Sequence, residues 1–318
     1  MNYEIHNQYP LTLLLLNDWS FITATGIDVV QYLQGKLTAD ITKLTRQQHI
    51  LTAHCDANGK ILSIIRLFYY KKGFAYILRT SVAAKQLYEL TKYAVFSQIT
   101  IREQHDITLL GVIGQEACNK LSNYFSQLPD LENPIIHLKK TTLLYFNLPY
   151  ERFLIITDSN TALTLKKDFP KHGNSQQWLS FDIASGFANI DIENSQKFIP
   201  QAVNLQALKS SISFKKGCYS GQEIIARVKY RGLNKRSMFW LTGISNIIPK
   251  IGSPIEWKIG NNCWRSIGTI LAAVKLTNNF ISVQVIMNHD MSIKSTFRIP
   301  GVETSNLTIQ PLPYDVIS

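Results

Sequence analysis

Short apolar runs joined by tight-turn residues dominate the first part of this chain. Residues 50–55 and 61–70 read as strands, and between them stands Asp56-Ala57-Asn58-Gly59. An Asn-Gly pair supplies the positive φ angles that a tight hairpin turn requires. Lys71-Lys72-Gly73 then turns the chain into a further strand, residues 74–78. This pattern predicts antiparallel hairpins and shows no βαβ rhythm, so it favours an α+β fold over a doubly wound one.

Two helices are expected beside these strands. Asp28 can cap a segment with apolar residues at every third or fourth position, namely Val30, Leu33, Leu37, Ile41 and Leu44. This spacing predicts one amphipathic helix that continues to about residue 44. A second apolar stripe predicts a helix over about 81–96, which completes a strand-rich unit.

The remaining chain predicts a second lobe and a C-terminal barrel. Strands over 107–113, 142–146 and 153–157, with helices at 115–125 and after Asp158, indicate an α+β lobe over about 105–173. From Ser237 onward apolar and polar residues alternate and turn residues recur at short intervals, which is typical of a small antiparallel barrel. The predicted division is therefore 1–236, with two α+β lobes, and 237–318, the β-barrel.

Composition narrows the class of protein. The 318 residues give room for two or three domains, and 45% hydrophobic with 17% charged residues is typical of a globular chain. The longest apolar run, 11–16, is far shorter than the roughly 20 residues of a membrane helix, and no signal peptide is recognisable, so we expect a cytoplasmic protein. The sequence has no GxGxxG after a strand, no P-loop, no HExxH and no GxSxG motif, which disfavours the dehydrogenases, ATPases and hydrolases that carry them.

The charge is uneven along the chain. The whole sequence carries +11, and residues 207–236 hold eight Lys and Arg against the single acid Glu223, which gives +7. A basic segment of this density favours an anionic partner such as nucleic acid, phosphate or a polycarboxylate.

Cys218 is the candidate reactive thiol. It lies between Gly217 and Gly221 in the run Lys215-Lys216-Gly217-Cys218-Tyr219-Ser220-Gly221-Gln222-Glu223, where glycine permits tight turns and cations stabilise a thiolate. We expect Cys118 to pack on a helical stripe and Cys263 to pack in the barrel. No CxxC pair occurs, and His54-Cys55-Asp56 is disfavoured as a metal site because strand neighbours point to opposite faces, so we predict no metal.

Three segments carry a family resemblance: 198–206, 213–223 and 231–236. Together they resemble the YgfZ family of bacterial folate-binding, tRNA-modifying proteins, and the KGCYxGQE core is its most specific part. The resemblance also extends to residues 11–19, 34–40, 53–60 and 175–179, and so covers nearly the whole chain.

The resemblance implies a relative of the folate-binding T-protein of glycine cleavage. It implies two α+β lobes, a C-terminal barrel, and a central channel for tetrahydrofolate or a derivative. The folate-contacting tryptophans of the family correspond to Trp19 and Trp178, and a flat pterin or aminobenzoyl ring can stack on an indole. Trp240, Trp257 and Trp264 lie in barrel-like segments, where we expect structural roles.

Three functions follow from these observations. The first, which the family resemblance implies, is a folate-binding accessory protein, rather than an enzyme, that helps iron–sulfur enzymes such as the tRNA methylthiolating enzyme, and thereby affects replication initiation through DnaA. Here Cys218 is the reactive or cluster-sensing thiol, and Lys215, Lys216 and Arg227 tune it.

The second is a folate-dependent one-carbon (aminomethyl) transferase, which needs a carboxylate near the folate nitrogens; the nearest candidates in the sequence are Asp40 and Asp56. The third is a direct tRNA binder that uses the basic segment 215–236, with an affinity that falls steeply with salt.

Overall fold

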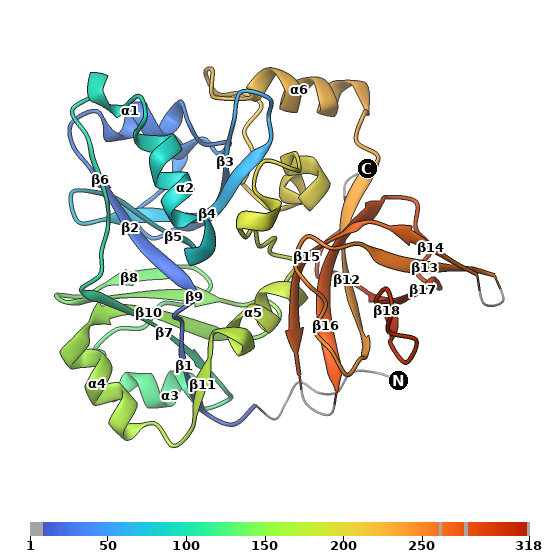
Figure 1. Ribbon diagram of the computed structural model, residues 1–318. Helices are drawn as coiled ribbons and strands as arrows, with labels where there is room; N and C mark the ends of the chain where they lie inside the picture. Colours follow the sequence, from blue (N-terminus) through green and yellow to red (C-terminus); the bar gives the residue numbers. More distant parts are fainter. Residues whose placement is uncertain (1–8, 261–262, 277–278, 317–318) are drawn as a thin grey trace.

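Three sheets make up the protein in the computed structural model, which describes residues 9–260, 263–276 and 279–316. Figure 1 shows a five-stranded N-terminal sheet, a six-stranded sheet beside it, and a seven-stranded C-terminal sheet against their flank. The α+β prediction is confirmed, including the antiparallel C-terminal unit. Within the described residues, no helix is long and apolar enough to span a bilayer.

The N-terminal sheet has the strand order β3-β4-β5-β2-β6. Its strands are β2 (Trp19–Thr25), β3 (His49–Cys55), β4 (Ile61–Tyr70), β5 (Gly73–Arg79) and β6 (Thr100–Glu103). The hairpin predicted between β3 and β4 is present, and Gly59 at its turn has φ +70°. Helix α2 (Thr80–Thr91) follows β5, and buried residues of both belong to one apolar core; the short helix η3 (Ala94–Phe96) comes next.

The long helix expected up to residue 44 is wrong. Helix α1 covers only Val29–Gln34, and a short 3-10 helix, η2, covers Ile41–Lys43. Leu37 instead forms a β-bridge with His54. The Thr38 side chain donates to the Ser211 carbonyl oxygen at 2.7 Å. The chain beyond Gly35 therefore finds its partners in distant segments, while Leu33, Leu37 and Ile41 are still buried as the spacing predicted.

The second sheet has the order β11-β1-β7-β10-β9-β8. Its strands are β1 (Thr12–Leu15), β7 (Ile107–Ile113), β8 (Ile135–His137), β9 (Thr141–Phe146), β10 (Arg152–Asp158) and β11 (His172–Asn174), and helices α3 (Ala117–Ser122) and α4 (Ser159–Asp168) pack on it. Strand β1, from the start of the chain, lies antiparallel to β7 and parallel to β11. The sheet of the predicted second lobe is thus completed by a strand from outside 105–173.

The C-terminal sheet is antiparallel, with the order β14-β13-β17-β18-β12-β16-β15. Its strands are β12 (Arg236–Ile244), β13 (Ile255–Gly260), β14 (Cys263–Ile267), β15 (Thr269–Lys275), β16 (Phe280–Asn288), β17 (Thr296–Arg298) and β18 (Asn306–Gln310). Helix α5 (Ser175–Ala184) packs Leu179 and Ile183 against Ala272 and Val274 of β15. This apolar contact joins the second lobe to the C-terminal sheet.

The segment between α5 and β12 connects the units. It contains the short helices η4 (Ile192–Asn194), η5 (Pro200–Val203) and η6 (Leu205–Ala207), and then α6 (Gln222–Arg231) at the edge of the molecule (Figure 1). Its buried residues share one core with β3, β4 and β12.

Two cysteine expectations are wrong. Cys118 and Cys263 are exposed, whereas Cys55 is buried. Helix α3 is only six residues long and buries Ala117 and Leu121, which leaves Cys118 on its outer side. Cys263 lies on β14, an edge strand of its sheet.

Candidate functional site

Trp19 and Trp178 lie 159 positions apart in the sequence, yet both line one small cavity between the N-terminal sheet and α5. Strands β3 to β5 contribute further wall residues, β9 and β10 contribute Phe146 and Leu154, and residues 187–190 close the remaining side. The open space is about 40 Å³. This is little more than the share of one water molecule in the liquid, so side chains already fill most of the region.

Trp178 is held firmly by its surroundings. Asn174 and Gln177 form a capping box that begins α5. The indole packs against Gly111 of β7, where a Cβ atom would lie only 2.6 Å from the indole Cε3. The Arg152 guanidinium lies 4.3 Å from the ring centroid, and Trp178 is only 2% exposed. Gly111, the capping box and Arg152 together thus hold the indole in one position.

A buried ion pair stands beside Trp178. Arg152 Nη2 donates to Asp182 Oδ1 at 2.7 Å, and the side-chain exposures are 1% and 10%. Burial lowers the pKa of Arg152, and the Asp182 carboxylate opposes this shift. Asp182 lines the cavity, so it places a carboxylate at the wall next to the indole.

Arg66 occupies the middle of this site. Its guanidinium lies 4.7 Å from the ring centroids of both Phe146 and Phe187. Arg66 Nη1 donates to His49 Nδ1 at 3.2 Å, and His49 Nε2 donates to the Tyr145 carbonyl oxygen at 2.9 Å. Burial lowers the pKa of Arg66 to about 10, with Asp182 raising it and Arg152 lowering it. The Arg66 guanidinium therefore lies close to two aromatic rings at once.

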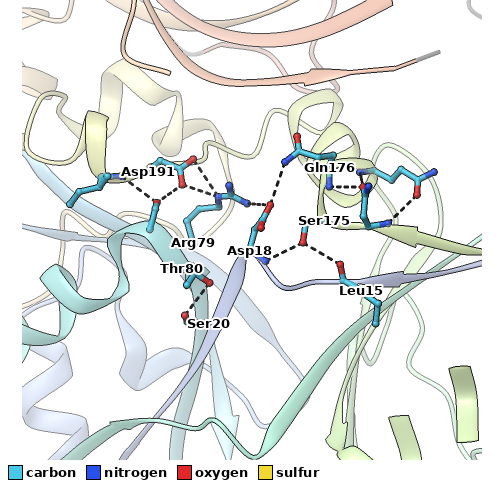
Figure 2. Close-up of polar contacts among 12 residues, drawn as sticks. Leu15, Asp18, Ser20, Arg79, Thr80, Ser175, Gln176 and Asp191 are labelled. Carbon is cyan, nitrogen blue, oxygen red and sulfur yellow. Dashed lines mark hydrogen bonds and ion pairs between the residues drawn. The ribbon is translucent and has the colours of Figure 1, made fainter. Parts of the chain in front are cut away.

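Arg79 provides a second cation, on the Trp19 side of the cavity. Its guanidinium lies 4.6 Å from the Trp19 ring centroid. Figure 2 shows Arg79 between Asp18 and Asp191: its Nε donates to Asp191 Oδ1 at 3.1 Å and its Nη1 lies 3.8 Å from Asp18 Oδ2. Arg79 Nη1 is buried and makes no hydrogen bond within the described residues. Its only partner at Nη1 among the described residues is thus the longer ion pair to Asp18.

Sequence reasoning missed four charged residues of this site: Arg66, Arg79, Arg152 and Asp182. One signal was available, because Asp182 follows Trp178 by four positions on a helix and such residues share a face. Arg66 and Arg79 lie on strands among apolar residues, and nothing local marks them.

The two carboxylates proposed from the sequence lie elsewhere. Asp40 accepts hydrogen bonds from Gln34 Nε2 and Thr42 Oγ1. Asp56 Oδ1 accepts from the N–H groups of Asn58 and Lys60 and thus stabilises the β3–β4 turn. Neither residue lines the cavity that Trp19 and Trp178 share.

The motif segments 34–40, 53–60 and 213–223 converge in a second cluster. The Ser213 N–H donates to the Thr38 carbonyl at 2.8 Å, and the Ser220 N–H to the Gly35 carbonyl at 3.1 Å. Gly221, at φ +78°, packs so closely on the β3–β4 turn that a Cβ atom would lie 2.5 Å from the Asp56 carbonyl oxygen. Glycine is needed at position 221 on both counts. Ile64, Ala188 and Ile190 belong to the apolar core of this cluster and also line the tryptophan cavity.

Cys218 is exposed on this cluster, as its glycine neighbours predicted. The Lys216 ammonium donates to the carbonyl oxygens of Gln34, Leu37 and Ala39 at 2.6, 2.8 and 2.7 Å. Arg227 forms an ion pair with Glu223 at 2.5 Å on the surface of α6. Both cations thus have specific partners other than the thiol, so their tuning of Cys218 stays a prediction.

The basic segment 215–236 is largely solvent-facing and includes α6. Lys229 Nζ lies 3.8 Å from the Phe214 ring centroid, and Tyr230 is 72% exposed. Cations and two aromatic rings, Phe214 and Tyr230, therefore lie together near the C-terminal end of α6.

Comparison with known proteins identifies relatives of this chain. A family model described as the YgfZ beta-barrel domain matches residues 234–301, in agreement with the predicted C-terminal barrel. The chain is 52% identical over 308 residues to the tRNA-modifying protein YgfZ of Photorhabdus laumondii subsp. laumondii, covering 96% of this chain and 93% of that one. It is 49% identical over 313 residues to the protein of the same name from Yersinia enterocolitica, covering 98% and 94%.

A solved structure shows the same fold. The crystal structure of glycine cleavage system aminomethyltransferase T from Bartonella henselae aligns with a TM-score of 0.73, over 97% of this chain and 87% of that chain. The sequence identity is 14%, so the likeness concerns the fold.

Proposed function

The chain belongs to the YgfZ family, and from this membership we propose that it is a folate-binding accessory protein in tRNA modification. The observation that carries the proposal is the cavity lined by both Trp19 and Trp178. Two tryptophans chosen from separate motifs meet at one site, together with a carboxylate and two arginines.

The chemical character of the cavity residues suits a reduced folate. A pterin is flat and rich in hydrogen-bond donors, so it matches aromatic walls and the Asp182 carboxylate. The glutamate tail carries carboxylates, for which Arg79 Nη1, which makes no hydrogen bond among the described residues, is a suitable partner. Folate would bring a carrier for one-carbon units to this site.

Binding requires Arg66 to move, because about 40 Å³ cannot hold a pterin. Its guanidinium now lies 4.7 Å from the ring centroids of both Phe146 and Phe187, and so occupies a slot beside aromatic rings that a flat ligand could use. Withdrawal of Arg66 would free this slot and leave its cation available to the incoming carboxylates. Trp178, packed under Arg152, would serve as a fixed wall, and Trp19 as the more accessible stacking surface.

The accessory role assigns Cys218 as a reactive thiol. It is exposed in a cluster of motif segments whose apolar core borders the folate cavity through Ile64, Ala188 and Ile190. In this proposal the thiol helps maintain iron–sulfur enzymes that modify tRNA, and through tRNA modification affects replication initiation by DnaA. Such work is consistent with a cytoplasmic protein.

Cells that lack the wild-type copy test the thiol. We expect Cys218→Ser to reduce iron–sulfur-dependent tRNA methylthiolation, while Cys118→Ser, at another exposed thiol, leaves it unchanged. Full methylthiolation with Cys218→Ser would show that the thiol is dispensable.

A one-carbon transferase is the second candidate, and Asp182 is the observation that favours it. This carboxylate lines the tryptophan cavity, as such chemistry would need, whereas Asp40 and Asp56 do not. Folate-dependent transfer of a one-carbon unit from an aminomethyl donor, lost in Asp182→Asn, would support this candidate. If the protein binds folate but transfers no one-carbon unit, the accessory role is the function that still fits.

Calorimetric titration of tetrahydrofolate tests the binding site. We expect the wild type to bind, and Trp19→Leu and Trp178→Phe each to weaken binding, by roughly fivefold for the removal of one stacking indole. Trp264→Phe, in the C-terminal sheet, is the matched control. Lack of binding by the wild type would refute the folate proposal, and unchanged binding in both cavity variants would move the site elsewhere.

A further inference from the structure

Two basic concavities lie away from the tryptophan cavity and share one loop, residues 43–48. The first has a volume of about 320 Å³ and is lined by Lys43, Lys215, Lys229 and Phe214 among others. The second has a volume of about 370 Å³ and is lined by Arg46, Lys71, Lys139, Lys140 and Tyr70 among others. Lys43 thus lines the first concavity and Arg46, only three positions further on, lines the second.

The charge of this surface is strongly one-sided. Seven Lys and Arg residues line the two concavities, against two acids, Asp40 and Asp158. Each acid forms an ion pair with one of these cations: Asp40 lies 3.2 Å from Lys43 Nζ and Asp158 lies 3.7 Å from Lys140 Nζ. Among the described residues, the other five cations have no acidic partner within ion-pair distance, so positive charge is in excess.

Each concavity also offers aromatic rings. Phe214 lines the first and meets Tyr230 edge to face at 6.3 Å. Tyr70 and His137 line the second, with ring centroids 6.4 Å apart. Cationic grooves that carry aromatic side chains are how proteins hold unpaired nucleotides, since phosphates meet the cations and bases stack on the rings.

We propose that these two concavities and the loop 43–48 form one track for an unpaired stretch of tRNA. This inference rests on the proposed role in tRNA modification and extends the RNA-binding surface well beyond the basic segment 215–236. Two concavities on either side of one loop fit a pliable single strand better than a rigid duplex. One small anion would need only one of them.

Binding of a fluorescein-labelled tRNA transcript, followed by anisotropy from about 50 to 200 mM salt, tests the track. One variant combines Lys71→Gln with Lys139→Gln, and a second combines Lys215→Gln with Lys229→Gln. The control combines Lys275→Gln with Lys294→Gln, which removes the same charge from exposed positions in the C-terminal part.

We expect both track variants to bind tRNA several-fold more weakly than the control. For each phosphate that a variant no longer binds, the slope of log K against log salt should fall by about one. Wild-type affinity in the Lys71/Lys139 variant, with weaker binding only in the Lys215/Lys229 variant, would confine RNA to the α6 region and overturn the track.

Two further results would also overturn it. One is the absence of tRNA binding by the wild type. The other is unchanged tRNA binding in both variants together with weaker binding of polyglutamylated tetrahydrofolate, which would make the cations a tail site. Titration with monoglutamyl tetrahydrofolate, which does not need the track, tells failure of the track apart from failure of the folate proposal.

Discussion

Single residues set the shape of the tryptophan cavity. The Trp178 indole rests on Gly111, with Arg152 over its ring, and Arg66 fills the gap between two phenylalanines. The two tryptophans were selected by the family resemblance, and the structure brings both to one cavity. The charged partners could not be predicted, since Arg66 and Arg152 contact side chains such as Phe187 and Asp182 that lie on other elements, well separated along the chain.

Gly111→Ala should displace the Trp178 indole, because the new methyl would lie 2.6 Å from Cε3. Overpacking of this kind costs about 1–3 kcal/mol of unfolding free energy. We expect that decrease in urea unfolding, with a changed tryptophan emission spectrum and weaker folate binding. Gly35→Ala, where the nearest atom is at 3.6 Å, is the control and should change stability little. Wild-type stability and emission in Gly111→Ala would show that the indole has room to move.

His54 should make the protein less stable in acid. It is 3% exposed, and burial, followed by the charge of Lys36, lowers its pKa from 6.5 to about 3. Between these values the unfolded state binds a proton that the folded state does not, so stability is complete above about pH 6.5 and falls as pH decreases toward 3.

Comparison with His54→Gln measures this effect. From pH 7 to 5 the wild type should lose about 2 kcal/mol more unfolding free energy than the variant. His289→Gln, at an exposed histidine, should follow the wild type. Parallel pH curves for the wild type and His54→Gln would contradict the buried neutral state.

At the scale of helices and strands, the local sequence pattern predicts some elements and not others. The β3–β4 hairpin was predictable because Asn58-Gly59 encodes its own turn. The helix expected beyond residue 34 is absent. Its apolar spacing correctly predicts that Leu37, Ile41 and Leu44 are buried, but it does not determine the conformation of the backbone between them. After Gly35 the backbone of Thr38 forms hydrogen bonds with Ala53 of β3 and with Ser213, and its hydroxyl donates to the Ser211 carbonyl oxygen. No local sequence pattern predicts these distant partners.

Lys216 ties the motif loop to the end of α1. Its ammonium donates to three backbone carbonyls, so Lys216→Met would leave part-buried acceptors without a partner. We expect a decrease of about 1–3 kcal/mol in unfolding free energy and faster hydrogen exchange at residues 34–40 and 213–220. Lys215→Met, at an exposed neighbour, should change neither measurement. Exchange unchanged by Lys216→Met would mean that the loop is fixed by its backbone hydrogen bonds alone.

At the scale of the whole molecule, α5 couples the cavity to the C-terminal sheet. Trp178 and Asp182 face the cavity, while Leu179 and Ile183 of the same helix pack on β15. The overall α+β class and the antiparallel C-terminal unit were predictable from strand patterns and turns. The packing of α5 between two units was not, because it depends on residues about 90 positions apart.

Ile183→Ala should therefore affect both sides of α5. Ile183 is fully buried, and removal of its outer carbons should cost about 2–5 kcal/mol of unfolding free energy. Folate affinity should fall with it, since the helix that carries Trp178 loses its support. Ile293→Ala, at a residue that is 63% exposed, is the control. Reduced stability with unchanged folate affinity would show that the cavity does not depend on the C-terminal sheet.

The placement of β1 affects the order in which the chain can fold during synthesis. The N-terminal sheet uses strands up to Glu103, so it can form as soon as that residue has left the ribosome. Strand β1 precedes all of them, yet its partners are β7 and β11, and β11 ends at Asn174. Strand β7 can pair with one edge of β1 once Ile113 has been made, but the other edge has no partner until β11 follows about 60 residues later. That edge is open to chaperones throughout the interval.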